Sequence, residues 1–561
     1  MTQRSSRTIW KFGAAFMGAL REDDIRRVLT FGAIALAIVA FALSTIGRGI
    51  TIDQSLFLLR AQLWLTGRSL YVDVQDVSPP PIYFLNALPT LISRASGWPI
   101  IFSFNFLTSS FAVLSGILLG TAGAPRYRLL TGAAWASILL LVHNYYFGQR
   151  EYMFVLAWVP YLACRTGVGT PPRWAQIGSG MLLGFMICLK PHFALIVAGA
   201  EVWIWLRCRS GALLAPFVAF FASGAFQVFI FLIFFDLDAY RRSVEGDTYY
   251  SALGLHYGDA IGVLFRSNVA WLTLVGCALA LGPVLSRGKL RPFIEATFAT
   301  VLFGALLMVL QGIARGYYYI PLYLPVLGML VVLVCRPPGE AEWRVRVILA
   351  LRSAGSMVWR RRASRDGYGI WISAVLLLSL FFMTSSSTGI GVLAAKWYLL
   401  GKRTPIFGEP NGDPFVTWVR AHVPARDGIS VIAPQYGEFF GDPIISMLRL
   451  NRVLFSQTTG LALDLSLAEA VGDRRAGCRA VGVLRRDIVT SNSKWVFIRR
   501  EMPVWASAQG NDPLIHFQHY PVFWDWFLDH YAPTDQFDRY TVYRRIAAVS
   551  GKDSEAALHC P

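Results

Sequence analysis

Asp53 is the first side chain whose position suggests chemistry. It follows the apolar stretch 28–47 and precedes the helix-like run 55–65, so we expect it at the height of a membrane surface. A carboxylate in that place can accept a proton from a sugar or lipid hydroxyl as the hydroxyl attacks. Because aspartate is also a favoured first residue of a helix, the alternative interpretation is that Asp53 caps the run 55–65.

Three short polar segments separate later apolar stretches, and each contains a cation. They are Gly148-Gln149-Arg150-Glu151, Lys190-Pro191-His192 and Arg315-Gly316-Tyr317-Tyr318-Tyr319. Lysine and arginine are suited to binding phosphate, and histidine can donate a hydrogen bond to it or titrate near neutral pH. Each segment alone is also compatible with a structural role, as an interfacial Arg–Glu pair, a solvated turn or an aromatic belt. Together they would stabilise a leaving phosphate while an acid activates the acceptor.

Glu201 is a separate case because it lies within an apolar stretch, 192–206. The sequence around it shows no obvious cation to neutralise it. An ionised group in such a stretch is expected to face the interior of a helix bundle. A structural role for Glu201 fits this position at least as well as a catalytic one.

The composition indicates that membrane-spanning helices carry these residues. The chain has 561 residues, of which 55% are hydrophobic and 15% charged, whereas soluble proteins carry about 25% charged residues. Its formal net charge of +18 comes from 52 basic and 34 acidic residues. Arginines cluster in short loops such as 126–128, 207–209 and 360–362, which is typical of the cytoplasmic loops of membrane proteins. Nucleic acid is therefore not an expected partner.

The alternation of apolar stretches and basic loops predicts about eleven membrane spans. They lie near 28–47, 98–120, 129–147, 152–165, 174–189, 192–206, 212–235, 268–285, 292–314, 317–335 and 369–387. The N-terminus and the basic segment 336–368 are then cytoplasmic, and the first loop, 48–97, lies outside. No signal-peptide cleavage site follows 28–47, so this stretch is expected to remain as the first span. In this topology the three cationic segments and Asp53 fall on the outer face.

A change in composition near residue 390 predicts a transmembrane domain, 1–390, followed by an exoplasmic domain, 391–561. The expected elements of the second domain are helices at 414–422 and 523–530 and strands at 429–433, 495–498 and 540–543. This mixture indicates an α/β or α+β fold. Cys478 and Cys560 could form one disulfide there, because disulfides persist in oxidising compartments.

These motifs resemble the GT-C superfamily of integral-membrane glycosyltransferases, whose mannosyl-, aminoarabinose- and arabinosyl-type members use polyprenyl-phosphate sugars. The matching pattern is Asp53 after the first span, then Gly67…Tyr71-Val72-Asp73…Asp76…Pro80-Pro81. The segments 148–151 and 190–192 resemble a set of bacterial members more closely. Two positions depart from the pattern. Gln54 stands where many relatives have glutamate, and Tyr319 stands where close relatives are expected to have histidine.

The resemblance implies an all-α polytopic membrane domain with a C-terminal exoplasmic α/β domain, located in the plasma membrane (the inner membrane of a bacterium). The implied reaction transfers a sugar, with inversion, from a polyprenyl-phosphate-linked donor to a cell-envelope glycan, lipid or protein. A transporter or flippase that binds the same lipid-linked sugar without chemistry remains an alternative, as does an O-antigen-ligase-like transferase. Transporters often contain inverted repeats and helices broken at mid-membrane, and the sequence shows neither.

The resemblance also implies residue roles. Asp53 would be the general base, and the donor phosphate would be bound by Arg150, Lys190, His192 and Arg315. Glu151 would orient Arg150. The acceptor side would include Asp73, Asp76, Tyr71 and Tyr319. No cofactor is required by the sequence, but Asp73 and Asp76 could help to hold a divalent metal such as Mg²⁺ or Mn²⁺.

Overall fold

The structure is a computed structural model and describes residues 22–47, 50–72, 78–123, 125–142, 146–207, 213–241, 244, 290–311, 319–335, 414–424, 426–432, 455–456, 474–500, 517–537 and 540–549. The chain forms two compact units. Unit 1 comprises Met1–Arg48, Asn105–Val228 and His256–Tyr398, and unit 2 comprises Gly49–Phe104, Phe229–Leu255 and Leu399–Pro561. The predicted domain division near residue 390 remains a prediction.

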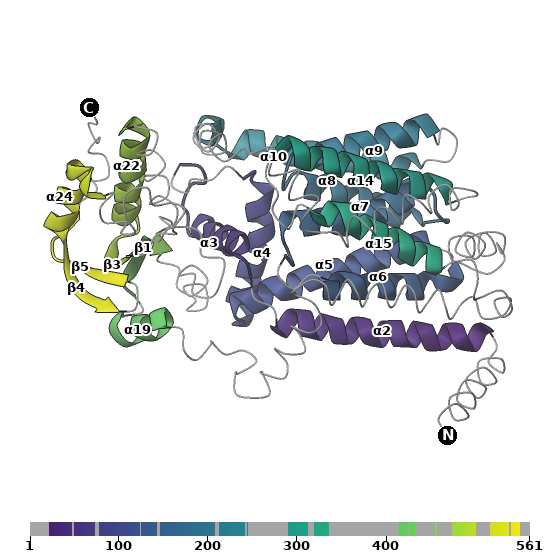
Figure 1. Ribbon diagram of the computed structural model, residues 1–561, viewed down its shortest axis with the longest axis horizontal. Helices are drawn as coiled ribbons and strands as arrows, with labels where there is room; N and C mark the ends of the chain where they lie inside the picture. Colours follow the sequence, from purple (N-terminus) through teal and green to yellow (C-terminus); the bar gives the residue numbers. More distant parts are fainter. Residues whose placement is uncertain are drawn as a thin grey trace, which may run out of the picture. The chain divides into compact units, whose positions relative to one another are not determined.

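Helices lie at the positions of the predicted spans throughout the described part of the chain (Figure 1). They are α2 (Glu22–Gly47), α5 (Ile100–Ala122), α6 (Arg128–Val142), α7 (Arg150–Arg165), α8 (Arg173–Ile187), α9 (Phe193–Arg207), α10 (Leu214–Phe234), α14 (Arg291–Gln311) and α15 (Ile320–Val334). The predicted spans 268–285 and 369–387 lie outside the described residues.

Four of these helices are long and apolar enough to cross a membrane, namely α2 over Arg26–Ile46, α5, α10, and α14 over Arg291–Met308. The remaining ones, α6, α7, α8, α9 and α15, have 15 or 16 residues. Large apolar side chains of α10 such as Phe221, Phe226 and Phe229 are more than half exposed, as expected for a surface that contacts lipid. These features indicate a membrane protein, while the exact number of spans remains a prediction.

Small residues let helices of unit 1 approach closely. A Cβ atom at Gly180 of α8 would overlap the carbonyl oxygen of Pro216, and one at Gly184 would overlap that of Phe220. The spacing of these two glycines is the small-xxx-small pattern of helix packing in membranes. In Figure 1 the helices of unit 1 run roughly side by side, and α7 packs against α8 while α14 packs against α9 and α15.

In unit 2, the first loop contains two helices that pack together, α3 (Ile52–Leu65) and α4 (Pro81–Ser96). The helix predicted at 55–65 is thus present and begins three residues earlier. Helix α4 was not predicted, because 55–65 was the only helix expected in the first loop, 48–97. Proline is favoured at the first position of a helix, and Pro81 occupies that position in α4.

The C-terminal part of unit 2 contains a five-stranded sheet in the order β2-β1-β3-β5-β4. The strands are β1 (Gly428–Ile432), β2 (Phe455–Ser456), β3 (Ser493–Arg499), β4 (Tyr531–Phe537) and β5 (Tyr540–Arg545), and the helices are α19 (Pro414–His422), α22 (Arg474–Thr490) and α24 (Pro521–His530). Strand β1 is parallel to both β2 and β3, and β5 is antiparallel to both β3 and β4. The mixed fold predicted here, with helices 414–422 and 523–530, is confirmed.

Strand β3 is covered on both faces, which explains its continuous apolar run. On one face, Val496 and Ile498 join a core with residues of α22 and α24. On the other, Phe497 contacts Phe415 of α19 at 5.1 Å between ring centroids. Cys478 of α22 is disulfide-bonded. Its predicted partner Cys560 lies outside the described residues, so that pairing remains a prediction.

Candidate functional site

The segment Gly148–Glu151 turns the chain into α7. Gly148 has a φ of 81°, a conformation that glycine adopts without strain. Gln149 is extended and precedes the first helical residue, and its backbone N–H donates to the carbonyl oxygen of Tyr146 at 3.1 Å. Arg150 and Glu151 therefore occupy the first turn of α7, where the helix dipole favours the carboxylate.

The segment Lys190–His192 forms the turn between α8 and α9, which confirms the predicted corner. The turn is held by backbone hydrogen bonds from Leu189 to Met186 and from Phe193 to Lys190, at 3.2 and 3.0 Å. Lys190 is buried, whereas His192 is exposed.

An ion pair joins these two segments. Lys190 Nζ lies 2.7 Å from Glu151 Oε1, and the two side chains are only 8% and 1% exposed. The ammonium also lies 5.9 Å from the ring centroid of Phe193. The second carboxylate oxygen of Glu151 is buried and has no hydrogen-bond partner among the residues that the structure describes. Glu151 was expected to orient Arg150, but the ion pair that it forms in the structure is with Lys190.

The charges of both segments affect the pKa of His192. Desolvation, followed by the positive charges of Lys190 and Arg150, lowers the pKa of His192 below its ordinary value of 6.5, and Glu151 acts in the opposite direction. The imidazole is therefore neutral at pH 7 and can donate a hydrogen bond, but it does not add a positive charge. Two cationic side chains, Arg150 and Lys190, and one carboxylate, Glu151, therefore gather around His192. An anion such as a phosphate group suits this arrangement.

Asp53 lies in the first turn of α3, in unit 2, but it is not the helix cap. The cap is Thr51, whose backbone N–H donates to Gln54 Oε1 at 2.6 Å in a capping box. The alternative interpretation of Asp53 as the cap is therefore wrong, and Gln54 completes the capping box with Thr51. Asp53 is partly exposed, and no other described residue forms a hydrogen bond or ion pair with its carboxylate.

Tyr71 and Tyr319 are both buried, at 3% and 5% exposure. Tyr71 has a φ of 69°, its hydroxyl donates to the carbonyl oxygen of Ser78 at 2.8 Å, and its ring packs edge-on against Tyr240 at 5.0 Å. Tyr319 lies directly before α15. These contacts describe packing, and an acceptor-side role for either tyrosine remains a prediction.

Three residues of the predicted site, Arg315, Asp73 and Asp76, lie outside the described residues. Within the residues that the structure describes, no group of three histidine, cysteine, aspartate or glutamate side chains could hold a metal ion. The expectation that Asp73 and Asp76 help to bind a divalent metal therefore remains untested.

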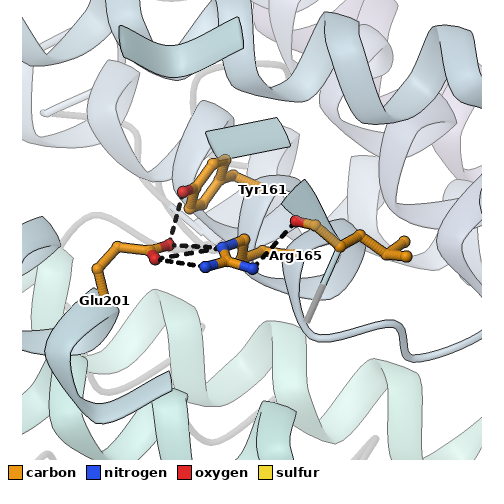
Figure 2. A network of polar contacts seen from close by, with 4 residues as sticks. Tyr161, Arg165 and Glu201 are labelled. Carbon is orange, nitrogen blue, oxygen red and sulfur yellow. Dashed lines mark hydrogen bonds and ion pairs between the residues drawn. The ribbon is translucent and has the colours of Figure 1, made fainter. Parts of the chain in front are cut away.

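The sequence failed to identify the partner of Glu201, which is Arg165 at the end of α7 (Figure 2). Arg165 Nη2 and Nε donate to the Glu201 carboxylate at 3.1 and 3.2 Å, and the Tyr161 hydroxyl donates to Glu201 Oε1 at 2.6 Å. Arg165 is the last residue of the predicted span 152–165 and is only 1% exposed. The spacing of Tyr161 and Arg165 by four residues, on one helix face, was the available signal.

Comparisons with known proteins add little to this description. No protein-family model matches the chain, and neither does any curated protein. The cryo-EM structure of the arabinofuranosyltransferase AftD from mycobacteria is similar at 13% identity and a TM-score of 0.43, covering 93% of this chain and 40% of that one. The chain thus spans 40% of the length of AftD. At this identity and TM-score the similarity establishes neither a common fold nor a common activity.

Proposed function

We propose that the protein is a membrane glycosyltransferase that moves a sugar from a polyprenyl-phosphate-linked donor to a cell-envelope acceptor at the outer face of the plasma membrane. The observation that carries the proposal is the gathering of Arg150, Lys190, Glu151 and His192 from two segments far apart in the sequence. This cluster lies at the ends of apolar helices, where a lipid-borne phosphate could reach it. The motif resemblance to GT-C enzymes supports the same assignment.

In this proposal Arg150 and Lys190 stabilise the negative charge that develops on the phosphate as the bond between the sugar and the phosphate breaks. The neutral His192 imidazole donates a hydrogen bond to a phosphate oxygen. Glu151 holds Lys190 in place through the 2.7 Å ion pair and balances the charge of that lysine in a buried position.

Asp53 is the proposed general base. The acceptor oxygen forms a bond to the anomeric carbon, the phosphate oxygen leaves with the electron pair of the broken bond, and the acceptor proton passes to the Asp53 carboxylate. The capping box of Thr51 and Gln54 supports this role, because it leaves the Asp53 carboxylate free of the capping function.

The test is transfer from labelled polyprenyl-phosphate sugars by the purified full-length protein. We expect Arg150→Gln to lower donor affinity and turnover together, by about tenfold or more. Removing Lys190 alone would leave the buried Glu151 carboxylate without the cation with which it pairs. The double variant Lys190→Met with Glu151→Met removes both members of the ion pair. We expect it to lose donor affinity and turnover.

The matched control is Lys494→Met, which removes a lysine from another ion pair, with Asp427 at 2.9 Å in the sheet of unit 2. Its donor affinity should equal that of the wild type. Unchanged donor affinity in both cluster variants would contradict the assignment of the phosphate site. Tight donor binding by the wild type without transfer from any donor would instead favour a transporter.

A further inference from the structure

Side chains of α7 meet those around α9 at three successive levels. Glu151 pairs with Lys190 at 2.7 Å, Phe154 stacks on Phe193 at 4.4 Å between ring centroids, and both Tyr161 and Arg165 bond Glu201. The residue numbers rise together along both segments, so α7 and α9 run in the same direction. Each end of this contact line therefore carries one buried ion pair.

The residues of α7 on this line form a single stripe along the helix. They are Glu151, Phe154, Tyr161 and Arg165. Trp158 lies on the same stripe, but its Nε1 donates to Thr300 of α14 at 3.0 Å. Every residue of α7 from Glu151 to Arg165 is buried, so apolar burial by itself does not select one face of the helix. Apolar contacts are also non-directional. Directional contacts select the rotation and axial position of α7. They include the two ion pairs, the hydrogen bond from Trp158 Nε1 to Thr300 and that from the Tyr152 hydroxyl to the Leu139 carbonyl oxygen of α6 at 2.9 Å.

The two ends differ in how completely their polar atoms are bonded. At the Glu201 end, Arg165 Nη1 also donates to the carbonyl oxygen of Leu213 at 3.0 Å, and the Leu213 N–H donates back to the Arg165 carbonyl oxygen at 2.9 Å. The guanidinium lies over the rings of Trp205 and Phe217 at 5.5 and 5.3 Å. Figure 2 shows the polar contacts that join Tyr161, Arg165 and Glu201.

The other end is incompletely bonded, because Glu151 Oε2 is buried without a hydrogen-bond partner among the described residues. An unpaired carboxylate oxygen accepts from a donor and would repel a phosphate, so it does not itself mark the ligand site. The phosphate-binding role of this end rests on Arg150, Lys190 and His192, as proposed above, whereas the polar atoms of Arg165 and Glu201 bond to one another and to Leu213 within the bundle.

We infer that Arg165 and Glu201 are positioning residues that fix α7 relative to α9, so that Arg150 and Glu151 meet Lys190 and His192. A slip of α7 by one turn would shift it by about 5.4 Å and separate both ion pairs. The inference rests on the proposed function for the identity of the ligand at the cluster, but not for the contact itself.

The experiment measures the titration of His192 by NMR in protein labelled at histidine, with the signal assigned from a His192→Asn sample. The variants are Glu201→Gln and the double variant Arg165→Met with Glu201→Leu, which removes the charged pair as a unit and so keeps the test valid where the single variant does not fold. In the wild type the pKa of His192 lies below 6.5. Desolvation is the largest cause of this lowering, followed by Lys190 and Arg150. We expect the variants to raise the pKa, because the contribution of the two cations is lost when they no longer lie beside the imidazole. The value of kcat/KM for the donor should fall by about 10²-fold.

The control is Ser115→Ala, which removes a buried hydrogen bond of 3.0 Å from Trp135 Nε1, between α5 and α6. It should lower stability without moving the titration of His192. An unchanged His192 titration in both folded variants would overturn the inference. Absence of sugar transfer by the wild type would refute the proposed function alone, because the titration can be measured without a donor.

Discussion

At the scale of single residues, His192 makes ligand binding depend on pH. Its pKa is lowered in the free protein by desolvation and by the neighbouring cations, and a bound phosphate would raise it. Binding therefore takes up a proton in the pH range between the lowered pKa of the free protein and the higher pKa of the complex, so donor affinity should increase as the pH falls through that range and should be level above it. Calorimetric titration of wild type and His192→Asn checks this, since the variant should lose the slope. Equal slopes in both proteins would exclude His192 from the site.

Asp53 and Gln54 provide a second comparison at this scale. Asp53→Asn keeps the size of the side chain and removes the basic oxygen, so turnover should fall by about 10²-fold with little change in donor binding. Gln54→Ala removes half of the capping box. It should cost about 1 kcal/mol of stability and leave turnover per folded molecule near normal. Transfer assays normalised to folded protein distinguish the two, and full activity in Asp53→Asn would remove it from the mechanism.

At the scale of elements, the approach of α8 to α10 depends on glycine. A Cβ at Gly180 would overlap the carbonyl oxygen of Pro216, whereas a Cβ at Gly178, on the same helix, would meet only a Leu118 methyl at 3.8 Å. Gly180→Ala should therefore destabilise the protein by about 1–3 kcal/mol, and Gly178→Ala should not. Thermal unfolding of both variants in the same detergent makes the comparison. Equal melting temperatures would mean that α8 and α10 are not packed as described.

Element positions followed from the sequence wherever an apolar run is bounded by proline, glycine or charge. The stretch predicted at 192–206 is α9, Phe193–Arg207, and the one at 174–189 is α8, Arg173–Ile187. Helix α22 was missed because its apolar residues Val481, Leu484 and Ile488 are set among arginines. The partner of Glu201 could not be predicted because Arg165 is 36 residues away and packing decides which cation faces it.

At the scale of the whole molecule, the predicted topology has a direct test. A cysteine at Gln518, an exposed residue beside α24 in unit 2, should react with an impermeant reagent added outside intact cells. A cysteine at Thr170, exposed between α7 and α8, should react only after the membrane is permeabilised, because the adjacent arginines predict a cytoplasmic loop. The reverse pattern would contradict both the topology and an outer-face activity.

The ion pair of Arg165 and Glu201 also has a consequence for the order of biosynthesis. The ribosome completes Arg165 before Glu201, which lies 36 residues further along the chain, and at roughly 5–20 residues per second this leaves an interval of a few seconds. During that interval α7 exists with an uncompensated cation at its end, while α8 and α9 are still being made. Assembly of this bundle therefore depends on the Glu201 carboxylate, which is made later than Arg165. Until then, the insertion machinery or water must accommodate the Arg165 guanidinium.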